Sequence, residues 1–160
     1  MAVDMFLKLK GIDGESVDDK HTGEIDVLAW SWGASQSGSM HHGGGGGSGK
    51  ANFQDISVTK WVDKGSHALL QACAKGTHID DGVLVVRKAG DKPLEYLTIF
   101  FKEIIVTSYS TGGSGGEDKL TENVSLNFRE FKLVYKGQKK DGSEDAAQEF
   151  AWNIAKNVAV

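Results

Sequence analysis

The sequence is poor in the residues that cross-link a chain, interrupt it or anchor it in a membrane. It has one cysteine, Cys73, and one proline among 160 residues, so no intrachain disulfide can form. No stretch approaches the length of about 18 apolar residues that a membrane-spanning helix needs. The N-terminus lacks the basic segment and apolar run of a secretory signal peptide. We therefore expect a chain that is made in the cytoplasm, inserts into no membrane and leaves the cell, if it does, by a route that accepts folded protein.

Positive charge is also scarce and scattered. The chain has 22 acidic residues against 18 basic ones, and the basic residues form no cluster along the sequence. Nucleic-acid binding depends on clustered Lys and Arg side chains that neutralise phosphates. We therefore expect no nucleic-acid partner.

Glycine, by contrast, is abundant, and two segments are dense in it. The first, "GSMHHGGGGGSGK" (38–50), fits most of the phosphate-binding loop pattern and all of the dinucleotide-binding pattern. Both patterns require a helix to follow, and the first also requires Ser or Thr after its lysine. Here Lys50 is followed by Ala51 and then by a strand-like alternation. We interpret this segment as a pliable hairpin tip; the glycines that carry the two matches are Gly44, Gly46 and Gly49.

The second glycine segment, "GGSGG" (112–116), fits the serine-hydrolase pattern around Ser114. A strand pattern follows it instead of a helix, and no spacing indicates a supporting His and acid. His41 and His42 are adjacent and lack the spaced partners of a metal site, while Cys73 lies on an apolar helix face, where a thiol packs as a small hydrophobe. We therefore expect no catalytic residue, no cofactor and no metal. An enzyme that works through either glycine segment, and a monomeric extracellular binding module, remain the alternatives.

The apolar residues recur mostly at every second position, which indicates strands. We expect seven of them, at 3–9, 25–37, 51–62, 79–88, 94–110, 124–135 and 150–155. The strand at 124–135 changes phase by one residue, which predicts a β-bulge near Arg129 and Glu130. The polar segment 137–148 is expected to be a mobile loop.

One helix is expected within "DKGSHALLQACAKG" (63–76), with Asp63 or Ser66 as its cap and Gly76 in the left-handed conformation at its end. Seven strands and one helix predict a mainly β fold of one domain, residues 1–160. The simplest closed solution is a small antiparallel β-barrel or two-sheet sandwich, with the short helix covering one opening.

Two of the expected strands have unusual faces. In the strand at 25–37, one face carries the large side chains of Leu28, Trp30 and Trp32 and is expected to pack in the core. The other face is small and should look onto solvent, a cavity or a partner; it consists of Ala29, Ser31, Gly33 and Ser35. The strand at 94–110 is apolar on both faces, which favours a subunit interface because one helix cannot cover the surplus.

Several blocks of the sequence resemble the Hcp (hemolysin-coregulated protein) family of bacterial type VI secretion. These blocks are "EIDVLAWSWGASQSGSMHHGGGGGSGKANFQDISVTKWVDK", "VLVVRKAG", "EYLTIFFKEIIVTSYSTGGSGGEDKLTENVSLNF" and "WNI". The resemblance runs from "MAVDMFLKL" almost to the C-terminus and implies a small β-barrel with one helix that assembles as a hexameric ring. His41 and His42 depart from the family pattern.

In this family the rings stack into the inner tube of a contractile injection apparatus, are secreted with it and carry small effector proteins in their lumen. The resemblance thus implies three kinds of partner: copies of the chain itself, the tip and sheath components of the apparatus, and small effectors. Because the chain ends shortly after "WNI", we expect a plain tube subunit without a fused toxin domain.

The resemblance also assigns roles to two sets of residues. We expect the small face, and Ser31 above all, to contact cargo in the lumen. The first glycine segment should order itself against the next ring through Met40, His41, His42, Gly43, Gly45 and Gly47. Deletion of residues 43–47 is then expected to leave the hexamer intact and to impair stacking and secretion.

Overall fold

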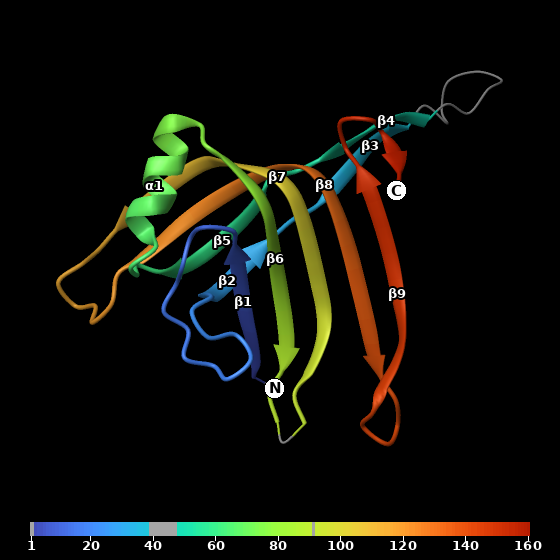
Figure 1. Ribbon diagram of the computed structural model, residues 1–160, viewed down its shortest axis with the longest axis horizontal. Coiled ribbons are helices and arrows are strands. Elements are labelled where there is room, and N and C mark those ends of the chain that lie inside the picture. The colour runs from blue at the N-terminus through green and yellow to red at the C-terminus, as the bar shows by residue number, and fades with distance from the viewer. Residues whose placement is uncertain (1, 39–47, 91) are drawn as a thin grey trace.

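The computed structural model describes residues 2–38, 48–90 and 92–160, which form ten strands and one helix (Figure 1). In chain order these are β1 (Val3–Leu9), β2 (Ile25–Ser31), β3 (Ala34–Gly38), β4 (Ser48–Phe53), β5 (Ile56–Trp61), α1 (Ser66–Lys75), β6 (His78–Lys88), β7 (Leu94–Gly112), β8 (Thr121–Gln138), β9 (Glu144–Asn153) and β10 (Val158–Ala159). In the described part of the chain, no helix is long and apolar enough to cross a membrane.

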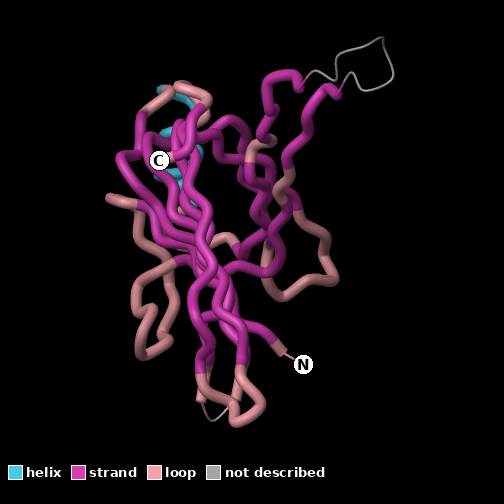
Figure 2. Tube along the Cα trace, turned by 90° about the vertical axis from the view of Figure 1, so that its right-hand side faces the viewer, coloured by secondary structure: helices cyan, strands magenta, loops and turns pink. Residues whose placement is uncertain are grey.

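Six of the strands close into an antiparallel barrel. Their order is β8, β5, β2, β1, β6 and β7, and β7 pairs again with β8 to complete the circle. In addition to β7, the long strand β8 pairs with two further strands. Its residues 121–126 pair with β5 and its residues 130–138 pair with β9. Strands β3 and β4 pair only with each other and project from the barrel as an arm, as Figures 1 and 2 show. The expected mainly β barrel with one helix is confirmed.

The core fills the barrel with the inward side chains of alternating strand residues. The helix adds Leu69 and Ala72 to this core, and Cys73 packs against it. Gly76 has φ 65° at the end of the helix, as expected from its freedom to adopt the left-handed conformation. The fully buried members of the core (exposed fraction below 2%) include Leu7, Ile25, Ile56, Val58, Leu69, Leu84, Ile99, Phe101, Ile104 and Leu126.

The start of the helix differs from the prediction, because Gly65 occupies the N-cap position and no side chain caps the helix. Asp63 instead accepts a hydrogen bond from the Gly65 N–H at 2.9 Å, and the Ser66 hydroxyl accepts one from the Asp63 N–H at 2.9 Å. Both residues predicted as caps thus order the turn that precedes the helix.

The expected strand at 25–37 is two strands, and Leu28 is not in the core. The register of β2 against β5 shifts between Val27 and Ala29, so Leu28 is an extra residue whose side chain is 39% exposed. Such a bulge moves the inward positions by one residue. Ile25 and Val27 are therefore buried before it, and Trp30 packs against the core after it.

The strand at 51–62 is likewise divided, into β4 and β5, with Gln54 and Asp55 between them. Its assignment as strand is confirmed, although the division gives more strands than the seven expected. The divisions in both segments face each other, since the Gln54 N–H donates to the Gly33 carbonyl at 2.9 Å. At this point the arm leaves the barrel.

The β-bulge predicted near Arg129 and Glu130 is wrong, although the change of face that suggested it is real. Phe128 and Phe131 are both buried, yet the register is unchanged, with Lys102 opposite Glu130 on one side and Ile104 opposite Phe128 on the other. Strand β7 changes face at the same place, where Glu103 adopts φ 53°. Because both strands take the same extra step, neither bulges relative to its partner.

This shared step also explains most of the apolar surplus on β7. The buried residues Ile99 and Phe101 precede it and Ile104 and Val106 follow it, so one core receives side chains from both sequence faces. Phe100 remains 41% exposed on the outside.

The polar segment 137–148 is mostly strand, not a mobile loop. Strand β8 continues to Gln138 and β9 begins at Glu144, with an ion pair of 3.5 Å between Lys136 and Glu144 across the two strands. Polar residues are compatible with strand here because both faces of the hairpin end are exposed.

Candidate functional site

One part of the outward face of four neighbouring barrel strands is made of small uncharged side chains. Two rows cross β2, β5, β8 and β7 in register, and each row contributes one residue from each strand. We call this surface the polar wall; its first row is Ala29, Thr59, Asn123 and Ser110, and its second row is Ser31, Ser57, Ser125 and Ser108.

Alternation along each strand builds this wall. Between the two polar rows lies a row that points inward and packs on or in the core, formed by Trp30, Val58, Val124 and Tyr109. Since successive strand residues point to opposite faces, the apolar side chains fill the barrel while the hydroxyls and amides stay outside. The wall is therefore fixed by the same packing that stabilises the fold.

The side chains of the wall bond to one another across the strands. The Thr59 hydroxyl donates to the Asn123 side-chain oxygen at 2.7 Å, and the hydroxyls of Ser57 and Ser125 lie 3.4 Å apart. Hydroxyls both donate and accept hydrogen bonds, so they can serve many polar partners without a strong preference. The wall can therefore hold a polar surface loosely, which suits contact or passage more than catalysis.

The four residues predicted for the small face do not stay together. Ala29 and Ser31 are exposed on the wall as expected, and Ser35 is exposed on β3, which belongs to the arm. Gly33 lies at the junction, where the Gln54 side chain covers the position that a Cβ would occupy. The predicted stacking residues Met40, His41, His42, Gly43, Gly45 and Gly47 lie outside the described residues.

Six wall residues escaped the sequence analysis, although a signal for them exists. In 56–60, 108–110 and 122–126 small polar residues alternate with buried or partly buried residues, much as small residues do in 29–31. The alternation shows that each strand has a face of small residues. It does not show that the four faces are neighbours, because pairing between distant segments is not local.

A buried ionic network lies at the end of the barrel beside the helix. Lys60 and Glu122 are both fully buried and form an ion pair, and the Lys60 ammonium also lies 3.1 Å from Asp63. Glu122 accepts hydrogen bonds from the hydroxyls of Ser66, at 2.7 Å, and of Tyr109. The network thus ties β5 and β8, the two central wall strands, to the start of α1.

These contacts shift the pKa values of two groups in opposite directions. Burial and the neighbouring Glu122 carboxylate raise the pKa of Tyr109 to about 12. Burial alone would raise the pKa of Glu122, but the hydrogen bonds from Lys60, Tyr109 and Ser66 outweigh it and lower that pKa. Lys60, Glu122 and Ser66 are buried at the centre of this network, which indicates that it supports the fold.

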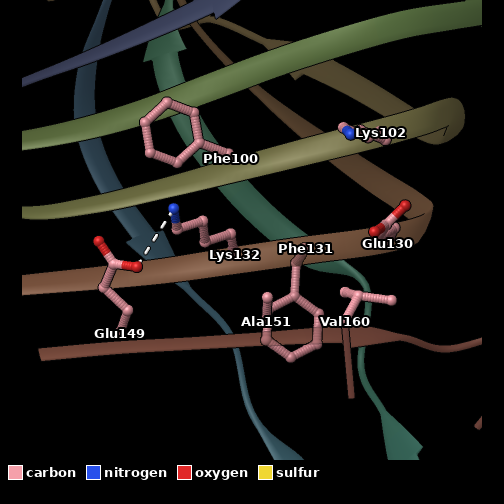
Figure 3. A pocket seen from close by; sticks show the side chains of 8 residues that line it. All are labelled: Phe100, Lys102, Glu130, Phe131, Lys132, Glu149, Ala151 and Val160. Atoms are coloured by element: carbon pink, nitrogen blue, oxygen red, sulfur yellow. Dashed lines mark ion pairs between the residues drawn. The ribbon is translucent and has the colours of Figure 1, made fainter. Parts of the chain in front are cut away.

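A groove on the outside of β7, β8 and β9 is a separate surface (Figure 3). Phe100 and Ala151 line it together with Val160, and Lys132 and Glu149 form an ion pair of 3.2 Å across it. It contains none of the residues predicted from the sequence. Lys102 and Glu130 also line the groove.

The structure also tests the context of the two glycine patterns. Strand β4 follows the first glycine segment and β8 follows the second, so neither segment precedes the helix that phosphate binding or a nucleophile elbow requires. Within the described residues, no group of three or more His, Cys, Asp or Glu is arranged to hold a metal ion.

Comparison with known proteins decides the family. The family model described as "Type VI secretion system effector, Hcp" matches residues 6–135. The chain belongs to the Hcp family. The resemblance seen in the sequence is thereby confirmed, and the polar wall and the arm are features of an Hcp-family barrel.

Individual relatives agree with this assignment over the whole chain. The Hcp-family chain is 56% identical to protein hcp1 of Pseudomonas aeruginosa over 160 residues, which cover 99% of each protein. Its structure is similar to that of a type six secretion system protein, with a TM-score of 0.93 and 32% identity over 99% of this chain and 100% of the other. It also resembles Hcp1 from Salmonella typhimurium, with a TM-score of 0.80 and 35% identity over 100% of both chains.

Proposed function

We propose that the chain is a structural subunit of the type VI secretion inner tube, in which hexameric rings stack and the polar wall lines the lumen. The observation that carries this proposal is the uncharged wall across four strands of an Hcp-family barrel. A tube interior must let cargo bind and still move, and a lining without charges or large apolar groups satisfies both needs. Ser31, which is exposed at the β2 end of the second row, is the residue we assign to cargo contact.

A closed ring requires two different surfaces on each subunit, because its contacts are heterologous. One is supplied by Tyr135 and Phe150, which are 47% and 48% exposed on neighbouring strands β8 and β9. Both side chains are on the same face of β8 and β9 as the core residue Phe131. They lie in the part of the sheet where β8 pairs with β9 and no longer with β5. The arm of β3 and β4, which pairs with no other strand in the described part of the chain, is a candidate for the other surface.

The remaining roles follow from membership of the family. Rings assemble in the cytoplasm, interact with the tip and sheath components of the apparatus, and leave the cell through it. Small effector proteins travel in the lumen. The chain acts as one non-enzymatic domain that needs no cofactor.

The experiment is to measure the mass of the purified chain in gel filtration and to image it by negative stain. A hexamer of about six times 17.2 kDa with an open centre is expected. A strict monomer at high protein concentration would exclude the tube subunit and favour a monomeric binding module.

A further inference from the structure

An acidic residue adjoins the second row of the uncharged wall. Asp55 lies in the link between β4 and β5, two residues before Ser57 of the second row. Two elements hold its carboxylate: the Thr107 hydroxyl donates to Oδ2 at 2.7 Å and the Asn127 amide donates to Oδ1 at 2.8 Å. Asn127 follows the wall residue Ser125 at the next outward position of β8. Asp55 therefore extends the wall by a third row that carries a charge.

A bulge in β7 places Thr107 at the Asp55 carboxylate. The register of β7 against β8 shifts between Val106 and Ser108, so Thr107 is an extra residue in β7. Its hydroxyl contacts both Asp55 and the Ser125 carbonyl, the latter at 3.2 Å. The bulge thus orients the donor that fixes Asp55.

No described residue neutralises the negative charge of Asp55. It forms no ion pair with any of the described residues. The nearest charges along β7 and β8, Glu103 and Arg129, neutralise each other at 2.8 Å. A carboxylate accepts about four hydrogen bonds, and those named here use only two of them.

The geometry points to Asp55 as a specificity-determining residue, which favours cargo that presents an arginine side chain to the wall. This inference rests on the proposed function, in which the wall lines a sixfold ring. Both carboxylate oxygens are held in fixed orientation and keep free lone pairs, and a planar guanidinium matches two such acceptors better than an ammonium does. A ring repeats the carboxylate six times, which makes an acidic belt next to the second row of the wall.

The test uses assembled rings and a dye-labelled tri-arginine peptide, with tri-citrulline as its uncharged match and tri-lysine as a second cation. Fluorescence anisotropy is expected to show that tri-arginine binds more tightly than both. Loss of a hydrogen bond to a charged group weakens binding by about tenfold or more. Asp55→Asn is therefore expected to weaken tri-arginine binding by at least about tenfold.

The control variant is Asp19→Asn, which removes an equal charge from an exposed position on the loop between β1 and β2 and should leave binding unchanged. Equal binding of tri-arginine to the Asp55→Asn and wild-type rings would overturn the inference. Wild-type rings that bind tri-citrulline as tightly as tri-arginine would overturn it without any variant. Ring mass is measured separately, so a failure to assemble counts against the proposed function and not against the role of Asp55.

Discussion

Replacing Lys60 by methionine isolates the contribution of the buried ionic network. Methionine has a similar length and fills the same space, but it cannot donate to Glu122, to Asp63 or to the Trp61 carbonyl, which the ammonium contacts at 2.8 Å. Glu122 would keep its bonds from Ser66 and Tyr109 while it remains fully buried. The variant therefore leaves a buried negative charge without its counter-ion.

The expected cost is large because the loss is a desolvated charge and not merely a hydrogen bond. Breaking a buried ion pair by removing one partner costs about 3–5 kcal/mol. The exposed pair of Lys10 and Asp80, at 3.3 Å with side-chain exposures of 63% and 77%, is the matched comparison. Lys10→Met should cost less than about 0.5 kcal/mol, since exposed ion pairs contribute little.

The assay is urea unfolding followed by tryptophan fluorescence, which reports on Trp30 and Trp32 beside the core. All variants must be compared at one protomer concentration, because assembly adds to apparent stability. Lys60→Met combined with Glu122→Gln should recover about 2 kcal/mol, since the fully buried carboxylate is then neutral and only Asp63, with 8% side-chain exposure, still lacks the ammonium. A loss below about 1 kcal/mol for Lys60→Met alone would refute the view that Glu122 depends on Lys60.

The unfolding free energy of Lys60→Met should also depend on pH differently from that of the wild type. In the wild type the pKa of Glu122 is lowered, so its contribution to stability is present above the unfolded pKa of about 4.3 and is lost as the pH falls. Without Lys60, burial dominates and the pKa of Glu122 should rise instead. The difference in unfolding free energy between wild type and variant should therefore narrow from pH 7 to pH 4; a constant difference would contradict this cause.

Three further variants test the ring, the wall and the helix end. Phe150→Asp should dissociate the ring into folded monomers in native mass spectra. The control Val17→Asp, at a loop position that is 94% exposed, should leave the ring assembled. An intact ring for both variants would show that Phe150 does not lie in the interface. Ser31→Trp should reduce the amount of cargo recovered with purified rings by about tenfold without changing the ring mass, which corresponds to a loss of about 1.4 kcal/mol in binding free energy. The control Val17→Trp should leave cargo recovery unchanged. Gly76→Ala should cost about 1 kcal/mol in urea unfolding, because φ is 65° there, while Gly116→Ala, with no positive φ and open space around it, should cost much less.

The sequence predicted those parts of the fold that depend on local patterns. Strand β1 was bounded correctly, and β6 to within one residue, because alternation and turn residues are visible within a few positions. The helix end at Gly76 was correct because its left-handed conformation is a property of that residue. Leu28 was misplaced because a bulge depends on the partner strand, which a single strand's alternation does not reveal.

The candidate site shows the same division more sharply. Alternation placed Ala29 and Ser31 outside the barrel, but it could not bring them beside Ser57 or Ser125, which lie far along the chain. The step shared by β7 and β8 illustrates why, since each strand alone reads as irregular and only the pair is regular.

The sequence by itself thus determined the mainly β class, the helix, the polar face of β2 and the family. The tertiary structure decided the closure of the barrel, the departure of the arm at Gly33, the eight-residue wall and the position of Asp55 beside it. The physical reason is that alternation is set by neighbouring residues along one strand. Register and adjacency are set by hydrogen bonds and packing between segments up to about a hundred residues apart, as in the row that joins Ala29 to Asn123.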